Sequence, residues 1–150
     1  MIVVIQRVSK AAVIIGQKVT ASIGHGLLLL VGIEELDTAE DISWLSNKIV
    51  NLRIFDDNNG VMNNSVMAVK GDILVVSQFT LHASTVKGNR PSYSKAAHPT
   101  ISLPLYNDFV LSLEKVFGRK VNTGEFGADM KVELVNDGPV TILIDSKNKK

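Results

Sequence analysis

The chain has 150 residues, a formal net charge of +1, an apolar fraction of 45% and no cysteine. These values are typical of a globular protein and exclude a disordered chain, a disulfide framework and a thiolate metal site. So small a net charge argues against a protein that grips long stretches of phosphate backbone, and any contact with nucleic acid should be local. The lack of cysteine suits a reducing compartment, so we expect a cytoplasmic protein with one domain over 1–150.

The first part of the chain is predicted to be β-structure. Four apolar segments indicate strands at 2–8, 11–15, 19–23 and 27–33. Gly16-Gln17 is typical of a hairpin turn, and the uninterrupted apolar run 27–33 favours a strand buried on both faces. The apolar start breaks at Gln6, too early for a signal peptide, and no apolar segment approaches the length of a membrane span. We therefore expect no membrane partner.

Two helices are predicted, at 38–52 and at about 103–117. Thr38 followed by Asp41 resembles a capping box at the start of the first helix. Apolar residues at three- and four-residue steps then mark one face of it: Ile42, Leu45, Ile49 and Leu52. The second helix has an inward face of the same kind, and Gly118 is its expected stop. Its inward residues are Leu105, Phe109, Leu113 and Val116.

The remaining segments complete an α+β pattern. Strands are predicted at 72–77, 130–134 and 140–144, and the polar segment 82–100 is predicted to be a loop. Asn136 to Pro139 is predicted to be a turn between the last two strands, and 146–150 a solvated tail. The elements do not alternate as in a doubly wound sheet. We expect an α+β fold with a mostly antiparallel, curved, barrel-like β-sheet and two main helices.

Few residues suggest catalysis by side chains. The three histidines fall in expected loops, and a Ser77/His82 nucleophile pair is less favoured than a chance proximity. Glu34-Glu35 directly follows a strand, where adjacent carboxylates usually face solvent. The acidic turn 56–60 lacks the ligand spacing of a calcium loop. The sequence therefore predicts neither a metal site nor a cofactor.

Two polar segments stand out at strand ends. Ser77-Gln78-Phe79-Thr80-Leu81 ends a very apolar strand, at a point where backbone N–H groups become free for a ligand. Asn136 to Thr141, NDGPVT, joins the last two expected strands. On residues alone, a plain strand end and a plain hairpin turn are the favoured interpretations. A Gly-Pro pair is nevertheless unusual there, because proline removes a ladder donor, and a cis bond at Gly138–Pro139 is a reasonable expectation.

Together, SQFTL (77–81) and NDGPVT (136–141) resemble the signature of the D-aminoacyl-tRNA deacylases. The similarity covers nearly the whole chain, and no expected segment is missing. It also includes IQRV (5–8), RIF (53–55), GNRPSYSKAA (88–97) and TGEFGADM (123–130). Tyr93 stands where phenylalanine is as commonly expected, which is a mild departure. Two motifs in the right order, with matching flanks, form a specific signal.

The resemblance implies a homodimer with two composite active sites that bind the aminoacyl 3′ end of tRNA and neither DNA nor a cofactor. Ser77, Gln78, Phe79 and Thr80 would line the pocket for the aminoacylated 3′ adenosine. The dipeptide Gly138-Pro139 would be cis and would reach into the partner's pocket as a chirality filter, held in orientation by Arg7. The implied reaction is hydrolysis of D-aminoacyl-tRNA, and of glycine mischarged onto alanine tRNA.

The residues suggest how such a site would work. N–H groups around Phe79 and Thr80 can stabilise the oxyanion of a tetrahedral intermediate, which makes these two residues the catalytic candidates. A base for the attacking water is not evident. Thr80 is one candidate, as nucleophile or as the group that orients the water. The neighbouring ribose 2′-OH of the tRNA is the favoured candidate, because an unassisted threonine hydroxyl is a poor nucleophile. Two alternatives stay open: a non-catalytic module that binds an RNA end or a small ligand, and a hydrolase of small D-amino acid esters.

Overall fold

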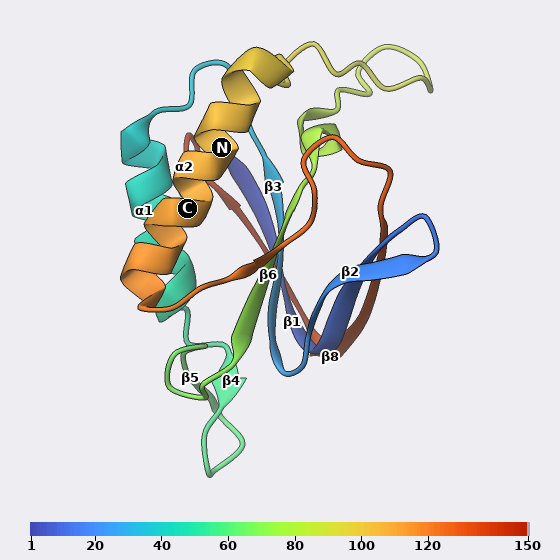
Figure 1. Ribbon diagram of the computed structural model, residues 1–150. Helices are drawn as coiled ribbons and strands as arrows, with labels where there is room; N and C mark the ends of the chain where they lie inside the picture. Colours follow the sequence, from blue (N-terminus) through green and yellow to red (C-terminus); the bar gives the residue numbers. More distant parts are fainter. Residues whose placement is uncertain (150) are drawn as a thin grey trace.

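The computed structural model describes residues 1–149 as a curved sheet covered on one face by two helices (Figure 1). The strands are β1 (Ile2–Ile15), β2 (Lys18–Ile23), β3 (Gly26–Gly32), β4 (Phe55–Asp56), β5 (Met62–Asn64), β6 (Asp72–Ser77), β7 (Asn122–Thr123) and β8 (Lys131–Asp145). The helices are α1 (Ala39–Asn51), a 3₁₀ turn η1 (Phe79–His82) and α2 (Pro99–Phe117). No helix among the described residues is both long enough and apolar enough to cross a membrane.

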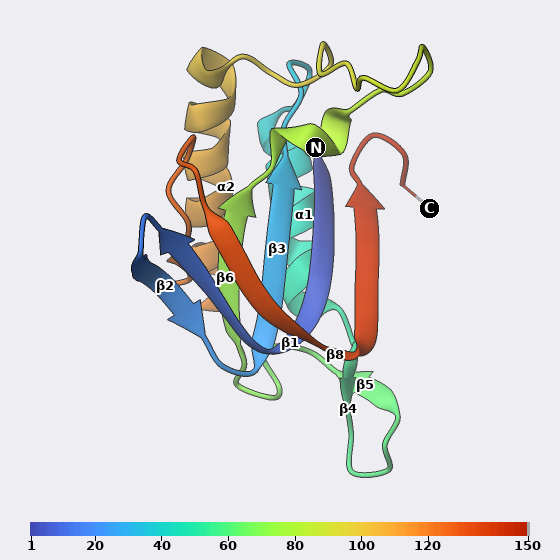
Figure 2. The ribbon, with the colours of Figure 1, turned by 90° about the vertical axis from the view of Figure 1, so that its right-hand side faces the viewer.

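The main sheet is mixed, in the order β2-β1-β3-β6-β7, and β8 lies along the other side of β1. Strand β1 pairs antiparallel with β2, β3 and β8, whereas β3–β6 and β6–β7 are parallel pairs. Both halves of β8 pair with β1: the first half, beside the end of β1, crosses in front of the sheet, and the second half runs beside the start of β1 (Figure 2). The sheet therefore nearly closes on itself. The predicted α+β fold with a curved, mostly antiparallel sheet is confirmed.

The long strands β1 and β8 correct two predictions. The segments expected as separate strands at 2–8 and 11–15 form one strand, β1. The turn expected at Asn136 to Pro139 is wrong, because β8 runs through it as a single strand paired with β1. The pairing of β8 with β1 is interrupted between the residue pairs Gln6–Thr141 and Val8–Asn136. Four residues of β8, 137–140, therefore face only Arg7 of β1. The turn-forming residues make a wide bulge, because pairing with β1 resumes on both sides of it.

Strand β3 is buried on both faces, as its apolar run predicts. Leu27, Leu29 and Val31 belong to the core cluster under α1 and α2, whereas Leu28 belongs to a second cluster enclosed by the curved sheet. The two clusters are separated by the sheet itself. This alternation follows from the two-residue period of a strand, and it fixes which residues of β3 face the helices.

The helices confirm the predicted faces but not every boundary. In α1 the Asp41 carboxylate accepts the Thr38 N–H at 2.8 Å, the capping contact that the sequence predicts. Helix α2 ends at Gly118, which has φ 79°, as expected. It begins at Pro99, earlier than the predicted 103, because proline fits the first helical position, where no N–H partner is needed. The start of α2 therefore lies beside the strand ends.

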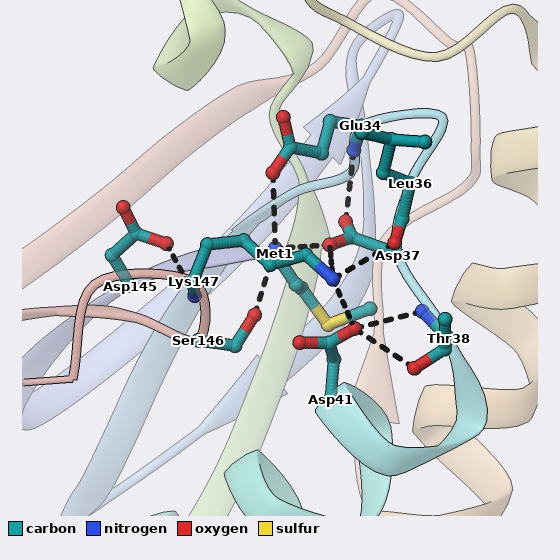
Figure 3. A network of polar contacts seen from close by, with 9 residues as sticks. All are labelled: Met1, Glu34, Leu36, Asp37, Thr38, Asp41, Asp145, Ser146 and Lys147. Atoms are coloured by element: carbon teal, nitrogen blue, oxygen red, sulfur yellow. Dashed lines mark hydrogen bonds and ion pairs between the residues drawn. The ribbon is translucent and has the colours of Figure 1, made fainter.

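The expected solvated tail is wrong for Ser146 and Lys147 (Figure 3). Ser146 is buried, and the Lys147 ammonium lies 2.6 Å from an Asp41 carboxylate oxygen and donates to the Leu36 carbonyl at 2.8 Å. Burial opposes ionisation of Asp41, but hydrogen bonds, chiefly from Lys147, outweigh it and hold the pKa of that carboxyl well below its usual value. The end of β8 is thus fastened to α1. Lys150, also part of the expected tail, lies outside the described residues.

Candidate functional site

A cavity of about 550 Å³ opens at the end of the sheet where β3 and β6 finish. Three stretches of chain form its walls. They are the strand ends with Val31, Ile33 and 76–79, the start of α2 with Ala96, Ala97, Pro99 and Ser102, and the segment 126–132 without Lys131. Most of these side chains are apolar, and the only charged group among them is Asp129. Such a lining suits a ligand with a flat or apolar part and few charges.

The SQFT segment enters this cavity because β6 leaves the sheet there. The Gln78 N–H still donates to the Val31 carbonyl at 2.8 Å, and the chain then turns into η1. Gly32 lets the turn lie against β3. A Cβ on Gly32 would come within 2.9 Å of the Leu81 Cβ and 3.1 Å of the Gln78 carbonyl oxygen. The missing side chain therefore sets the position of Ser77, Gln78 and Phe79 at the cavity.

The beginning of η1 presents two backbone donors, the N–H groups of Phe79 and Thr80. The Leu81 N–H donates to the Gln78 carbonyl and the Ala83 N–H to the Thr80 carbonyl. By contrast, the N–H groups of Phe79 and Thr80 have no acceptor within residues 1–149. Free N–H groups at the first turn of a helix attract a negatively charged oxygen. These two N–H groups are thus not used by the described part of the chain, and their role as oxyanion donors stays a prediction.

The Thr80 hydroxyl has no base beside it. It accepts a hydrogen bond from the Gln78 side-chain amide, and no titratable side chain within 1–149 bonds to it. His82 lies four residues after Gln78 and is 6% exposed. Its Nε2 has no hydrogen-bond partner within residues 1–149. Ser77 and His82 share no hydrogen bond, so the structure does not form the nucleophile pair considered from the sequence.

Composition and spacing alone do not point to the third stretch of the cavity wall as part of the site. It contains Phe126, Asp129 and Met130, which lie in a segment that the sequence marks only by family resemblance. Tyr106 supports this wall from behind: its ring lies 5.6 Å from that of Phe126, and its hydroxyl donates to the Val75 carbonyl at 3.1 Å. Burial raises the pKa of Tyr106 to about 12, so it remains a neutral donor.

The Gly138–Pro139 bulge forms a second polar cluster around Arg7. The Arg7 side chain is buried, its Nε donates to the Asp137 carbonyl at 2.9 Å and its Nη1 to the Ile54 carbonyl at 2.7 Å. Its guanidinium also faces the carboxylates of Asp137 and Asp56 at 3.7 and 3.3 Å. One buried cation therefore ties the bulge to the chain before β4. Arg7 thus contacts the bulge, whereas its role in orienting the dipeptide stays a prediction.

Hydrogen bonds within the NDGPVT segment itself also hold the bulge in shape. The Asn136 side chain accepts the Val140 N–H at 2.8 Å and donates to the Thr141 hydroxyl at 2.9 Å. Gly138 has φ 134°, and the Gly138–Pro139 peptide bond is cis, as expected. A Cβ on Gly138 would lie 2.8 Å from the Val140 Cγ2 and 3.0 Å from an Arg7 nitrogen. The exposed dipeptide is consequently held by groups behind it.

The two clusters are not brought together within one chain. In the register, Arg7 pairs with Leu27 of β3, whereas Ser77 pairs with Val31. Four residues along a strand correspond to roughly 13 Å, and the clusters lie on strands that flank β3 on opposite sides. Figure 2 shows η1 and the bend of β8 at opposite ends of the sheet. Neither Gly138 nor Pro139 lines the cavity.

The described residues contain no group of three or more histidine, aspartate or glutamate side chains placed to hold a metal ion. Among the residues predicted for the site, Ser77, Gln78 and Phe79 line the cavity, and Thr80 follows them in η1. Arg7, Gly138 and Pro139 form the separate bulge cluster. The arrangement offers backbone donors and an apolar cavity at one end, and rigid exposed main chain at the other.

Comparison with known proteins identifies relatives over almost the full length. The family model described as D-Tyr-tRNA(Tyr) deacylase matches residues 4–145. Two relatives named D-aminoacyl-tRNA deacylase, from Flavobacterium johnsoniae and Bacteroides fragilis, are 65% and 66% identical over 148 residues, 99% of each chain. A solved structure titled c-Myc DNA unwinding element binding protein has a TM-score of 0.92 and 39% identity, covering 97% of this chain and 98% of that one. A structure of a probable eukaryotic D-amino acid tRNA deacylase has a TM-score of 0.81 at 17% identity, covering 95% and 97%.

Proposed function

Because the chain belongs to the D-Tyr-tRNA(Tyr) deacylase family, we propose that it works as a homodimer in which Gly138–Pro139 of one copy completes the cavity of the other. The chain is a hydrolase that cleaves the ester bond of D-aminoacyl-tRNA. One observation carries the proposal for its mechanism. The dipeptide is exposed and firmly held, yet it lies at the end of the sheet away from its own cavity. Only a second copy can bring it to the SQFT segment.

A filter made of main-chain atoms explains selection of the D-form. Backbone atoms of Gly138 and Pro139 would clash with the substituent of an L-configured Cα, whatever side chain lies beyond it. The same filter would accept any D-side chain that points away from it, which suits a broad corrector of translation. Glycine has no side chain to exclude. We therefore propose that glycine mischarged onto alanine tRNA is also hydrolysed.

The chemical step uses backbone donors and the substrate's own hydroxyl. Water attacks the ester carbonyl, and the N–H groups of Phe79 and Thr80 stabilise the negative charge that develops on its oxygen. The carbonyl carbon then releases the ribose oxygen, which takes up a proton, giving the free D-amino acid and tRNA. The adjacent ribose 2′-OH orients the water, because the Thr80 hydroxyl is bonded to Gln78 and has no base beside it.

The cavity suits the terminal adenosine. Its apolar lining, which includes Phe79, Phe126 and Met130, matches the flat base. The net charge of +1 restricts the contact with tRNA to a few phosphates near that end. We place this activity in the cytoplasm, where aminoacyl-tRNA is made and used.

The experiment that tests the proposed function is a time course of hydrolysis for four substrates. They are D-tyrosyl-tRNA, L-tyrosyl-tRNA, alanine tRNA mischarged with glycine, and a free D-tyrosine ester. We expect rapid loss of the first and third, and survival of the second and fourth. Equal hydrolysis of both enantiomers would contradict the chirality filter. Hydrolysis of the free ester alone would favour a small-ester hydrolase, and binding without turnover would favour a non-catalytic module.

A further inference from the structure

A positively charged loop adjoins the cavity. Between Asp72 and Asp108 the sequence contains no carboxylate, yet it carries Lys87, Arg90 and Lys95, all of them exposed. We propose that the loop 84–95 binds the phosphodiester backbone of the unpaired nucleotides that precede the terminal adenosine. This inference rests on the proposed function, because it takes the cavity to be the site of that adenosine.

The loop is attached directly to the cavity. It projects from the end of the sheet where η1 lies (Figures 1 and 2). The backbones of Ser84 and Ser92 exchange two hydrogen bonds, of 2.8 and 2.9 Å, which close its base. The Tyr93 ring meets the Phe79 ring edge-on at 5.1 Å, and Phe79 lines the cavity. A strand that leaves the cavity past Phe79 therefore meets this loop next.

The charge of the loop is not neutralised by the protein. Within residues 1–149 none of Lys87, Arg90 and Lys95 forms an ion pair. Two exposed cations on other parts of the surface are paired by contrast: Arg119 lies 2.7 Å from Asp72, and Lys120 lies 2.9 Å from Glu114. Unpaired cations attract polyanions, and each phosphate contact releases counterions.

The chemistry of the substrate selects phosphate as the partner of the loop. The groups that join the terminal adenosine to the nucleotides before it are phosphodiesters, spaced one per nucleotide. An arginine and two lysines on one loop match a few such groups, and the near-neutral chain has no further excess of charge for a long contact. The loop would thus grip the single-stranded end and leave the body of the tRNA largely free.

The test measures binding of uncharged tRNA, so that it does not depend on catalysis. We compare wild type with a triple variant, Lys87→Gln, Arg90→Gln and Lys95→Gln, over a range of potassium chloride concentrations. For single strands each phosphate contributes about 0.7 to the slope of log affinity against log salt, so the slope should fall by about 2. A matched control replaces three exposed lysines away from the cavity, Lys18, Lys48 and Lys115, by glutamine, and it should keep the wild-type slope.

A second probe locates the contact on the RNA. With tRNA that lacks its three terminal nucleotides, we expect wild type and the loop variant to bind equally weakly. Equal slopes of the two triple variants on intact tRNA would overturn the proposal. If wild type fails to hydrolyse D-tyrosyl-tRNA, the proposed function is wrong. If wild type hydrolyses it at a normal rate but the loop variant keeps the wild-type slope, only the proposed role of the loop is wrong.

Discussion

The cavity and the Gly138–Pro139 bulge are built in opposite ways. The cavity is lined by three segments that are distant in the sequence, and most of its lining side chains are apolar. Two backbone N–H groups at the start of η1 have no acceptor within residues 1–149. The bulge belongs to one strand and is fixed by bonds from the polar side chains of Arg7 and Asn136 to its backbone. The first arrangement can receive a ligand, and the second presents rigid main chain. The proposed function accordingly assigns binding to the cavity and stereochemical selection to the bulge.

The largest effect is expected from Gly138→Ala. The added methyl would meet Val140 and Arg7, and a φ of 134° is strained for alanine, so the exposed dipeptide must shift. Since displacement of a positioning group by about 1 Å can cost roughly a hundredfold in rate, we expect a loss of that order on D-tyrosyl-tRNA. The melting temperature should change little. The measurement is single-turnover deacylation together with a thermal melt.

Gly16→Ala is the matched control for that variant. Gly16 also has a positive φ, at 64°, but a Cβ there meets nothing within 4 Å. It lies in the turn between β1 and β2, away from both clusters. Its activity should equal that of wild type. Loss of activity in both variants, or in neither, would show that the bulge has no special role.

Arg7→Ala should have the next largest effect. It leaves the carbonyls of Ile54 and Asp137 without their donor and frees the bulge from the chain before β4. An unsatisfied buried polar group costs about 1–3 kcal/mol, so both stability and deacylation should fall, the latter by about thirtyfold. Arg7→Lys can replace only one of the two bonds and should recover part of the activity. Full activity of Arg7→Ala on D-tyrosyl-tRNA would show that the bulge needs no such support.

Gly32→Ala tests the other region. Its Cβ would press on Leu81 and on the Gln78 carbonyl, which should push η1 away from β3 and move the two backbone donors. Overpacking of this kind costs about 1–3 kcal/mol, and we expect deacylation to fall about tenfold. Gly24→Ala, with open space around its Cβ, is the control. If Gly32→Ala keeps the wild-type kcat and KM, the position of η1 does not matter for the reaction.

The smallest effect is expected from Thr80→Ala. Because within residues 1–149 the hydroxyl bonds only to the Gln78 amide and no base bonds to it, we expect deacylation within about threefold of wild type. Replacing the terminal ribose 2′-OH by hydrogen should instead abolish the reaction. The two measurements share one assay, with wild-type protein on the deoxy substrate and the variant on the normal one. Complete inactivity of a folded Thr80→Ala protein that still binds tRNA would make the hydroxyl the nucleophile.

The contrast between the two regions also explains what the sequence could reveal. The apolar run of β3, the faces of both helices and the Gly118 stop were predictable, because each depends on local periodicity or backbone preference. The bulge was mistaken for a hairpin turn, because NDGP has the composition of one. Its true form depends on pairing of β8 with β1, and the two strands are more than a hundred residues apart in the chain.

The cavity was only half predictable for a related reason. SQFT is a polar segment at a strand end and therefore attracts attention, whereas the rest of the lining consists mostly of ordinary residues. Ala97 and Phe126 carry no chemical signature that distinguishes them from any core residue. Their role follows from the fold, which brings the start of α2 and the segment after β7 to the same end of the sheet.

Subunit mixing tests the central claim most directly, because that claim places the cavity and the filter of each site in different copies. A Gly138→Ala protein is mixed with a cavity variant, Gln78→Ala with Phe79→Ala, after each is shown to be dimeric and nearly inactive alone. Random exchange makes half of the dimers mixed, and each mixed dimer holds one intact composite site. The account predicts recovery of about a quarter of wild-type activity on D-tyrosyl-tRNA. No recovery, although mass spectrometry shows mixed dimers, would contradict it.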